Sequence, residues 1–307
     1  MSFDDLIEVS AQSSIFCRPW WLDAVAPGMW EYVTVESGGK TVAAMPVVRK
    51  GRNIVMPILT QTLGILFGPI KGSYPRVLST KQTLSTEIID QLPSFNCFSQ
   101  NFHYSYTDWL PFYWRDFKQS TRYTYVIECI DPNRNWLGIR KGVRSEIKQA
   151  RSRVEVREDI PLRDFHSICR LTYKKMERSY PRKTIERIDS ACGERDARKI
   201  ISALSKSGEI VGSIYLVGNS KSTYYLLSGS RLENEHPGVL ALLLWEGIQA
   251  TAGRSKSFDF EGSMVRNISD KFRRFGGVQK PYSYIWKDNY ISSIKKRLRF
   301  FKPLLIR

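Results

Sequence analysis

The stretch FDFEGSMVRNISDKFRRFGGVQKPYSYIW, residues 258–286, carries the strongest structural signal in the chain. Aromatic and acidic residues alternate at its start, which is the period-two pattern of a strand. That pattern predicts that Phe258 and Phe260 face a core while Asp259 and Glu261 share the opposite face. A short turn and a basic-aromatic FRRFGG loop follow, and the aromatic residues at the end indicate a second strand. The stretch therefore predicts two strands that present charged groups at one edge of a sheet.

The residues before this stretch predict a sheet covered by helices. Glycine-containing turns at Ser207-Gly208 and Gly218-Asn219 separate the strands of a meander. Three strands, an apolar helix and a further strand are expected over 199–205, 210–218, 222–229, 238–252 and 256–260. Ahead of them, helices are expected over 139–152, 162–178 and 182–192, with a strand over 153–157. Helices before a meander, followed by strand–helix–strand, favour α/β layers.

The first half of the chain repeats part of this plan. A short helix over 20–25 precedes a hairpin of strands at 31–36 and 41–48, which Ser37-Gly38-Gly39 closes. Residues 53–70 are apolar and loop-like. A helix over 81–93 and strands over 95–102 and 122–129 follow. A helix before a glycine-turn hairpin occurs in both halves, which indicates a weak repeat at the scale of a domain.

Charge divides the chain at the same place. The chain has 307 residues and a net charge of +17. Residues 1–128 hold 11 basic and 11 acidic side chains, so residues 129–307 hold 47 − 11 = 36 basic and 30 − 11 = 19 acidic ones. We therefore expect two domains, 1–130 and a basic 131–307, and an anionic partner for the second.

Several protein classes are disfavoured by pattern. The acidic start MSFDDLIEVS does not look like a signal peptide, and the longest uncharged stretch is too polar to cross a membrane. Five scattered cysteines and three scattered histidines predict neither a disulfide framework nor a metal site. The glycine motifs of dinucleotide and nucleoside triphosphate binding, and the nucleophile elbow, do not occur. These patterns predict a cytoplasmic protein.

The 258–286 stretch resembles the C-terminal signature of the FemAB-like proteins of the GNAT acyltransferase superfamily, which include the peptidoglycan-bridge aminoacyl ligases. PWWLDAV, LTQTLGILFGP and RSEIKQARSRVEV resemble further parts of that group, in the same order. The resemblance implies two tandem GNAT-like domains, each with a mixed, mostly antiparallel sheet flanked by helices. Two features depart from it: the length leaves no room for the helical arm of the longer ligases, and RLENEHPGVLAL lacks the second glycine of the GNAT pyrophosphate loop.

Asp259 and Glu261 are the candidate catalytic residues. An amine must be neutral to attack a carbonyl group, and a carboxylate whose pKa is tuned by burial can remove its proton. The alternative is a structural role, in which one acid caps the following Gly262-Ser263 turn or pairs with Arg273 or Arg274.

Candidate substrate-binding residues lie in four segments. Basic side chains on one helix face and in the FRRFGG segment suit an anion, and Gly238 and Val239 open a helix whose free amides attract phosphate. An aromatic strand residue completes the set. The candidates are Arg144, Lys148, Gly238, Val239, Lys271, Arg273, Arg274 and Tyr282. Solvated basic faces, a plain loop-to-helix junction and core packing are the alternatives.

The resemblance implies an N-acyltransferase or aminoacyltransferase that acts on an amine of a sugar or peptide precursor of the cell envelope. Acyl-CoA, acyl carrier protein and aminoacyl-tRNA are the possible donors, and a nucleotide-linked or lipid-linked sugar suits the basic half as acceptor. The tail 289–302 predicts a basic amphipathic helix, for which contact with an anionic membrane and docking of its apolar stripe on the protein are the two alternatives. A nucleic-acid-binding protein and a non-catalytic GNAT-like assembly module are the alternatives.

Overall fold

The computed structural model describes residues 2–128, 131–158, 160–175, 177, 179–231, 237–262 and 264–289. The chain forms two compact units: unit 1 is Met1–Arg122 with the described residues from Pro281 on, and unit 2 is Tyr123–Lys280. The expected ranges 1–130 and 131–307 differ from these units at the C-terminus. Strand β12 (Val278–Asp288) begins in unit 2 and then pairs antiparallel with β5 (Cys97–Asn101), so the end of the chain belongs to unit 1.

Unit 1 contains short helices and a small mixed sheet. Its strand order is β1-β2-β3-β5-β12, and β4 pairs with β2. The predicted hairpin is present, and Gly38 and Gly39 close it with φ angles of 57° and 68°. The other elements are α1 (Phe3–Val9), the 3-10 helix η1 (Ile15–Cys17), α2 (Pro19–Val25), β1 (Trp30–Ser37), β2 (Lys40–Lys50), β3 (Asn53–Ile54), β4 (Leu66–Phe67), α3 (Tyr74–Asp90) and α4 (Leu110–Tyr113).

Two expectations for unit 1 need correction. The segment 53–70 is not only loop, because it contains the two-residue strands β3 and β4. Helix α3 begins at Tyr74, seven residues before the expected start at 81. Pro75 lies in its first turn, where the missing amide hydrogen costs no helical hydrogen bond, so the proline starts the helix and does not exclude it.

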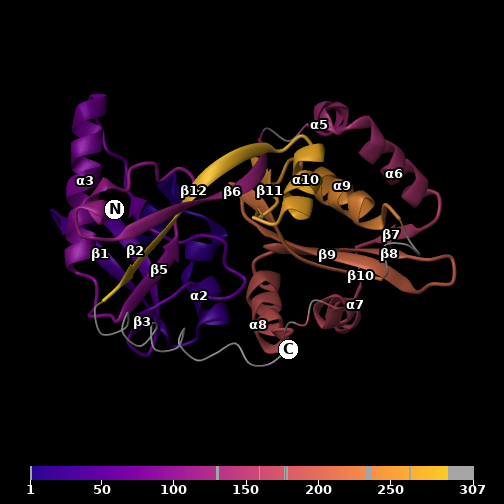
Figure 1. The fold of residues 1–307 in the computed structure, drawn as a ribbon, viewed down its shortest axis with the longest axis horizontal. Coiled ribbons are helices and arrows are strands. Elements are labelled where there is room, and N and C mark those ends of the chain that lie inside the picture. The colour runs from indigo at the N-terminus through magenta and orange to yellow at the C-terminus, as the bar shows by residue number, and fades with distance from the viewer. Residues whose placement is uncertain are drawn as a thin grey trace, which may run out of the picture. The chain divides into compact units, whose positions relative to one another are not determined.

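Unit 2 is one mostly antiparallel sheet with helices on both faces. Its strand order is β6-β11-β10-β9-β8-β7, and only β10 and β11 pair in parallel among these described strands. Helices α7 and α8 cover one face, and α6, α9 and α10 the other (Figure 1). The elements are β6 (Lys118–Glu128), α5 (Pro132–Gly138), α6 (Lys141–Arg151), β7 (Glu155–Arg157), α7 (Leu162–Lys175), α8 (Arg182–Gly193), β8 (Arg198–Leu204), β9 (Ile210–Gly218), β10 (Ser222–Ser230), α9 (Val239–Thr251), β11 (Ser257–Asp259) and α10 (Arg266–Arg274).

The core of unit 2 forms where the apolar helix α9 lies on the meander. Phe258 and Phe260 are 0% and 1% exposed within this core, as their alternation predicts. Gly247 of α9 allows close packing, because a β-carbon there would lie 3.1 Å from side-chain atoms of Ile214 and Leu216. The α/β fold class, with mostly antiparallel sheets flanked by helices, is thereby confirmed.

The expectation of a loop around FRRFGG is wrong, because helix α10 includes the start of this segment. Residues 266–274 are helical, and Ile268, Phe272 and Phe275 recur with the spacing of one helix face. Phe272 and Phe275 are buried, so core packing fixes a helix whose other side chains are mostly charged. In the described part of the chain, helices are too short or too polar to cross a membrane. The tail predicted to form a helix, 289–302, lies outside the described residues from 290 on.

Candidate functional site

Strands β10 and β11 pair over a short distance and then part. Their parallel register joins Ser222–Tyr224 to Ser257–Asp259. Beyond it, β10 has an irregularity between Tyr225 and Leu227, and β11 ends at Asp259. In sheets of this kind, ligands bind at the carboxyl ends of parallel strands, where neighbouring strands diverge. The end of β11 is therefore the first candidate position for a binding site.

Asp259 holds the turn that follows β11. Its carboxylate is 2% exposed, accepts a hydrogen bond from the Thr124 hydroxyl, and accepts another from the Glu261 amide at 2.8 Å. These contacts match the structural alternative in which this acid caps the turn. Because β11 ends at Asp259, the alternation that predicted a shared face does not extend to Glu261.

Glu261 is a buried acid in an unusual backbone conformation. Among the described residues, its Oε1 atom is buried without a hydrogen-bond partner, and its φ angle of 60° lies in the left-handed region. Burial raises the pKa of the Glu261 carboxyl well above its ordinary value, and the nearby charge of Asp259 raises it further. Strained backbone and unpartnered buried polar atoms persist where the surrounding structure imposes them, and both are frequent at functional sites.

Tyr225 lies beside this acid on β10. Its hydroxyl donates to Ser228 at 2.5 Å, and its ring contacts that of Phe272 with centroids 6.1 Å apart. Burial raises the pKa of Tyr225, and the charge of Glu261 adds to the rise. Helix α10 thus covers the end of the diverging strands through Phe272, which also stacks on Phe260 at 4.8 Å.

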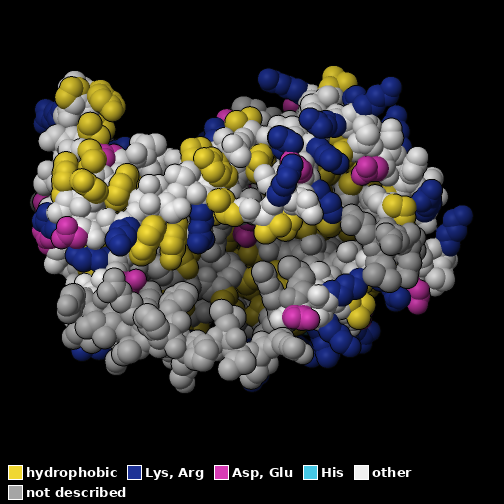
Figure 2. Space-filling model, viewed as in Figure 1, with side chains coloured by type: hydrophobic (Ala, Val, Ile, Leu, Met, Phe, Trp, Pro, Cys, Tyr) yellow, Lys and Arg dark blue, Asp and Glu magenta, His cyan; other side chains and the backbone are white. Residues whose placement is uncertain are grey.

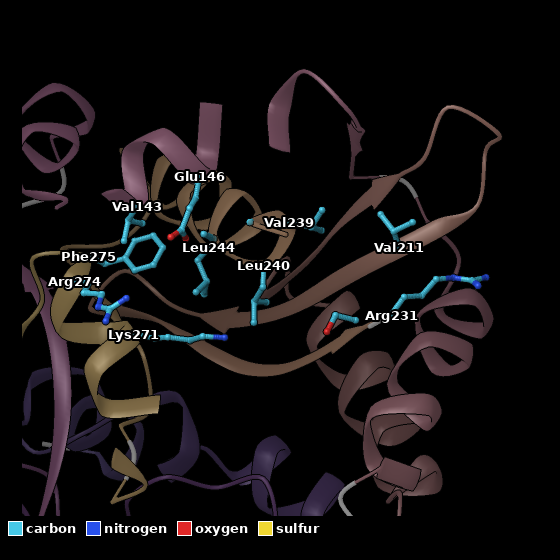
Figure 3. A pocket seen from close by; sticks show the side chains of 13 residues that line it. Val143, Glu146, Val211, Arg231, Val239, Leu240, Leu244, Lys271, Arg274 and Phe275 are labelled. Atoms are coloured by element: carbon cyan, nitrogen blue, oxygen red, sulfur yellow. The ribbon is translucent and has the colours of Figure 1, made fainter. Parts of the chain in front are cut away.

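A pocket opens around the start of α9 within unit 2, with about 750 Å³ of space that is partly open to solvent. The end of β10 contributes Ser230 and Arg231, and α6 contributes Val143 and Glu146. Figure 3 shows these side chains together with those from α9 and α10. Buried apolar groups form its floor: Val143, Val211, Val239, Leu244 and Phe275.

Gly238 fixes the start of α9 against α6. It has a φ angle of 80°, and a β-carbon on it would lie 2.8 Å from the backbone oxygen of Glu146. Glycine is therefore required both by the backbone angle and by the close approach. Gly238 and Val239, which were predicted as binding residues, both line the pocket.

Helix α10 supplies the pocket with positive charge. Lys271 and Arg274 line it, whereas Arg273 pairs with Asp270 at 2.7 Å and is absent from the lining. The Arg231 guanidinium extends away from Lys271 and Arg274 in Figure 3. It contacts Glu209 at 3.6 Å and the Ile210 carbonyl oxygen at 3.3 Å.

The remaining predicted residues lie outside this pocket and stay predictions. On α6, Val143 and Glu146 line the pocket, and Arg144 and Lys148 do not. Tyr282 is on the part of β12 that belongs to unit 1. In Figure 2, lysine and arginine side chains gather over the region where Figure 1 places α5, α6 and α10. This surface is consistent with the basic helix face that the sequence predicts.

Other pocket residues were not predicted. Leu240 and Leu244 lie four residues apart on α9, which is a signal for one helix face, but their pattern was interpreted only as core. Glu146 and Phe275 carry no local signal, because their position depends on how α6 and α10 pack on the sheet. Among the described residues, no group of histidine, cysteine and acidic side chains is arranged to hold a metal ion.

Comparison with solved structures identifies the fold. The structure of FemX matches with a TM-score of 0.66 at 11% identity, covering 92% of this chain and 94% of that one. L-PGS from Bacillus licheniformis gives 0.55 at 10% identity, covering 98% and 96%. A tandem GNAT protein from the clavulanic acid biosynthesis pathway gives 0.52 at 10% identity, covering 93% and 96%. No protein-family model and no curated protein sequence matches the chain. The chain has a FemAB-like, GNAT-related fold, so the resemblance is confirmed for the fold.

Proposed function

We propose that this chain is an acyltransferase or aminoacyltransferase in which unit 2 binds the activated donor and Glu261 accepts a proton from the attacking amine. The observation that carries the proposal is the Oε1 atom of Glu261, which is buried without a hydrogen-bond partner among the described residues, where β10 and β11 part. The fold shared with FemX and a tandem GNAT protein supports this reaction class. An N-acyl or aminoacyl product of a sugar or peptide precursor of the cell envelope is the specific outcome we propose.

The chemistry requires one proton acceptor. The amine nitrogen attacks the donor carbonyl carbon, forming the N–C bond, and the bond from that carbon to the leaving sulfur or oxygen breaks. The amine proton passes to the Glu261 carboxylate, and the leaving group takes up a proton. A carboxylate with a raised pKa is a stronger base than an exposed one, so burial strengthens Glu261 as a proton acceptor.

The unit 2 pocket fits a donor that combines phosphate with an apolar segment. Lys271 and Arg274 lie at one side and the α9 N-terminus at another, which favours a phosphate group. The apolar floor would hold the uncharged part of the same molecule. Acyl-CoA, acyl carrier protein and aminoacyl-tRNA all carry phosphate, and each remains a possible donor.

Helix α10 connects the pocket to the proposed base. Lys271 and Arg274 line the pocket from this helix, while Phe272 between them contacts Tyr225 and Phe260. Donor binding and the position of the Glu261 environment therefore depend on the same nine-residue helix. Lys271 and Arg274 would therefore couple donor recognition to the helix that packs against the surroundings of Glu261.

The test is a mass-spectrometric screen of acyl-CoA esters, acyl carrier protein and aminoacyl-tRNA against amine-bearing nucleotide sugars and lipid-linked precursors. We expect one pair to give an N-acylated product. With that pair, Arg274→Glu should raise the donor KM about tenfold or more, because it reverses a charge that faces the donor phosphate. Arg273→Glu is the matched control, since its partner is Asp270 and it lies outside the pocket lining.

Two outcomes would overturn the proposal. One is an absence of product with every donor class from a folded chain. The other is that Arg273→Glu and Arg274→Glu weaken the binding of RNA equally without any transfer activity, which would favour the nucleic-acid-binding alternative. Unchanged turnover in Glu261→Gln would show that Glu261 is not the proton acceptor. Catalysis would then come from the positioning of the amine and the donor.

A further inference from the structure

Unit 1 contains a second pocket at the topological position that the first occupies in unit 2. In unit 2 the pocket lies at the end of β10, the start of α9 and the helix after β11. In unit 1 it lies at Phe67, the last residue of β4, at the first half of α3, and at residues 105–108 after β5. The chain just before β4 also runs parallel to the chain just after β5, through the isolated Leu63–Phe102 bridge.

This repetition is independent of the transferase proposal. A strand–helix–strand unit with parallel strands places a crevice at the carboxyl ends of the strands, which is where ligands bind in α/β sheets. Two such crevices in one chain provide two binding positions. Their linings differ, so we expect different ligands.

Aromatic and apolar side chains line the unit 1 pocket. The Phe67 and Tyr106 rings are nearly parallel, with an interplanar angle of 11° and centroids 6.1 Å apart. Tyr74, which is 78% exposed, stands at the first turn of α3 with Val77 and Leu78. Exposed aromatic rings beside buried ones form a surface on which a planar or branched apolar group packs.

One positive and one negative side chain also line the pocket, and they are not paired with each other. The Lys81 ammonium lies 5.7 Å from the centroid of the Phe67 ring and has no ion-pair partner among the described residues. Asp108 accepts hydrogen bonds from the Gln82 side-chain amide at 2.8 Å and from the Leu110 amide at 3.1 Å. Each carboxylate oxygen can accept a second hydrogen bond, so Asp108 retains capacity for a cation.

We propose that the unit 1 pocket binds a free amino acid with an aromatic side chain. The ligand carboxylate would face Lys81, its ammonium would face Asp108, and its ring would pack on Phe67, Tyr106 and Tyr74. The charges argue against a nucleotide, because the lining holds one cation and one anion, whereas the lysine and two arginines of the unit 2 pocket outnumber its one acid, Glu146. An aromatic amino acid matches all three features of the lining with one small molecule.

The experiment compares three probes by isothermal titration against the full chain: L-phenylalanine, 3-phenylpropionate and 2-phenylethylamine. The second probe lacks the ammonium and the third lacks the carboxylate. We expect phenylalanine to bind at least tenfold more tightly than either. Lys81→Met should abolish the difference between phenylalanine and phenylethylamine, and Asp108→Asn should abolish the difference between phenylalanine and phenylpropionate.

Lys71→Met is the matched control, because this exposed lysine precedes α3 and does not line the pocket. It should leave all three affinities unchanged. Equal binding of the three probes, or no saturable binding of phenylalanine, would overturn the proposal on the unmodified chain, whatever the variants do. An equal loss of affinity in Lys71→Met and Lys81→Met would also overturn it, since the effect would then be one of net charge.

Discussion

A β-carbon placed on Gly262 would lie 2.1 Å from the backbone carbonyl oxygen of Tyr123. The backbone after β11 therefore lies directly against strand β6 at Gly262, with no space for a side chain between them. Gly262 also has a φ angle of 64°, next to the left-handed Glu261. Both residues have left-handed backbone angles shortly after Asp259, so the position of the Glu261 carboxyl depends on the glycine that follows it.

Gly262→Ala should therefore destabilise unit 2 strongly. The left-handed angle alone costs an alanine about 1–2 kcal/mol, and the backbone overlap with Tyr123 adds to that cost. Urea unfolding followed by circular dichroism would measure the change. Gly253→Ala is the matched control, because Gly253 has a φ angle of 75° but no neighbouring atom within 4 Å. Equal losses in the two variants would show that the Tyr123 contact relaxes.

Phe260→Ala should destabilise the chain by about 3–5 kcal/mol, because truncating a buried ring leaves a cavity. The ring is 1% exposed and stacks on Phe272, which holds α10 in place. Chemical denaturation would measure the loss. Val265→Ala, at an exposed apolar position just before α10, should cost far less. A loss below about 1 kcal/mol for Phe260→Ala would mean that α10 collapses into the cavity without strain.

Local patterns predicted the parts of the fold that depend on neighbouring residues. The alternation at 258–260, the glycine turn at Gly38-Gly39 and the apolar run of α9 each specify an element without reference to distant residues. Helix α10 was missed because the charged residues of 266–274 outnumber the apolar residues of its buried face. The assignment of β12 to unit 1 was missed because its pairing with β5 joins residues far apart in the sequence, and β12 itself carries no signal for its partner.

In the candidate site, too, residue types could be predicted locally, whereas contacts between distant residues could not. Gly238, Val239, Lys271 and Arg274 were predicted, and the structure places all four in one pocket. Basic side chains and a glycine at a helix start indicate an anion site whatever their position in the fold. The difference between Arg273 and Arg274 depends on which side of α10 meets the pocket, and a loop interpretation cannot supply that. The roles of Asp259 and Glu261 also differ only in three dimensions. Oδ1 of Asp259 accepts two hydrogen bonds, whereas Oε1 of Glu261 has no hydrogen-bond partner among the described residues.

Asp259→Asn should lower the pKa of Glu261, because it removes the negative charge that disfavours ionisation of the second carboxyl. It should also cost about 1–3 kcal/mol of stability, since a buried charged acceptor for the Thr124 hydroxyl and the Glu261 amide is weakened. Carbon-detected NMR titration of the glutamate carboxyls would follow the pKa. Asp270→Asn, which breaks the exposed pair with Arg273, is the control and should leave the Glu261 titration unchanged. An unaltered Glu261 titration in Asp259→Asn would contradict the coupling.

Glu261→Gln should change how stability depends on pH. The pKa of Glu261 is higher in the folded chain than in the unfolded chain, so the folded state binds more protons between those two values. The stability that protonated Glu261 contributes is complete below the unfolded pKa. It declines as pH rises, by about 1.4 kcal/mol per pH unit, until the folded pKa is reached.

The uncharged glutamine of the Glu261→Gln variant has no such proton to lose. The variant should therefore gain stability relative to the unmodified chain as the pH rises from the unfolded pKa of Glu261 towards its folded pKa, which urea midpoints at each pH would show. Glu194→Gln, at an exposed acid of unit 2, controls for the loss of one negative charge. Parallel pH profiles for Glu261→Gln and the unmodified chain would mean that Glu261 is ionised without cost, and its role as a base with a raised pKa would then be wrong.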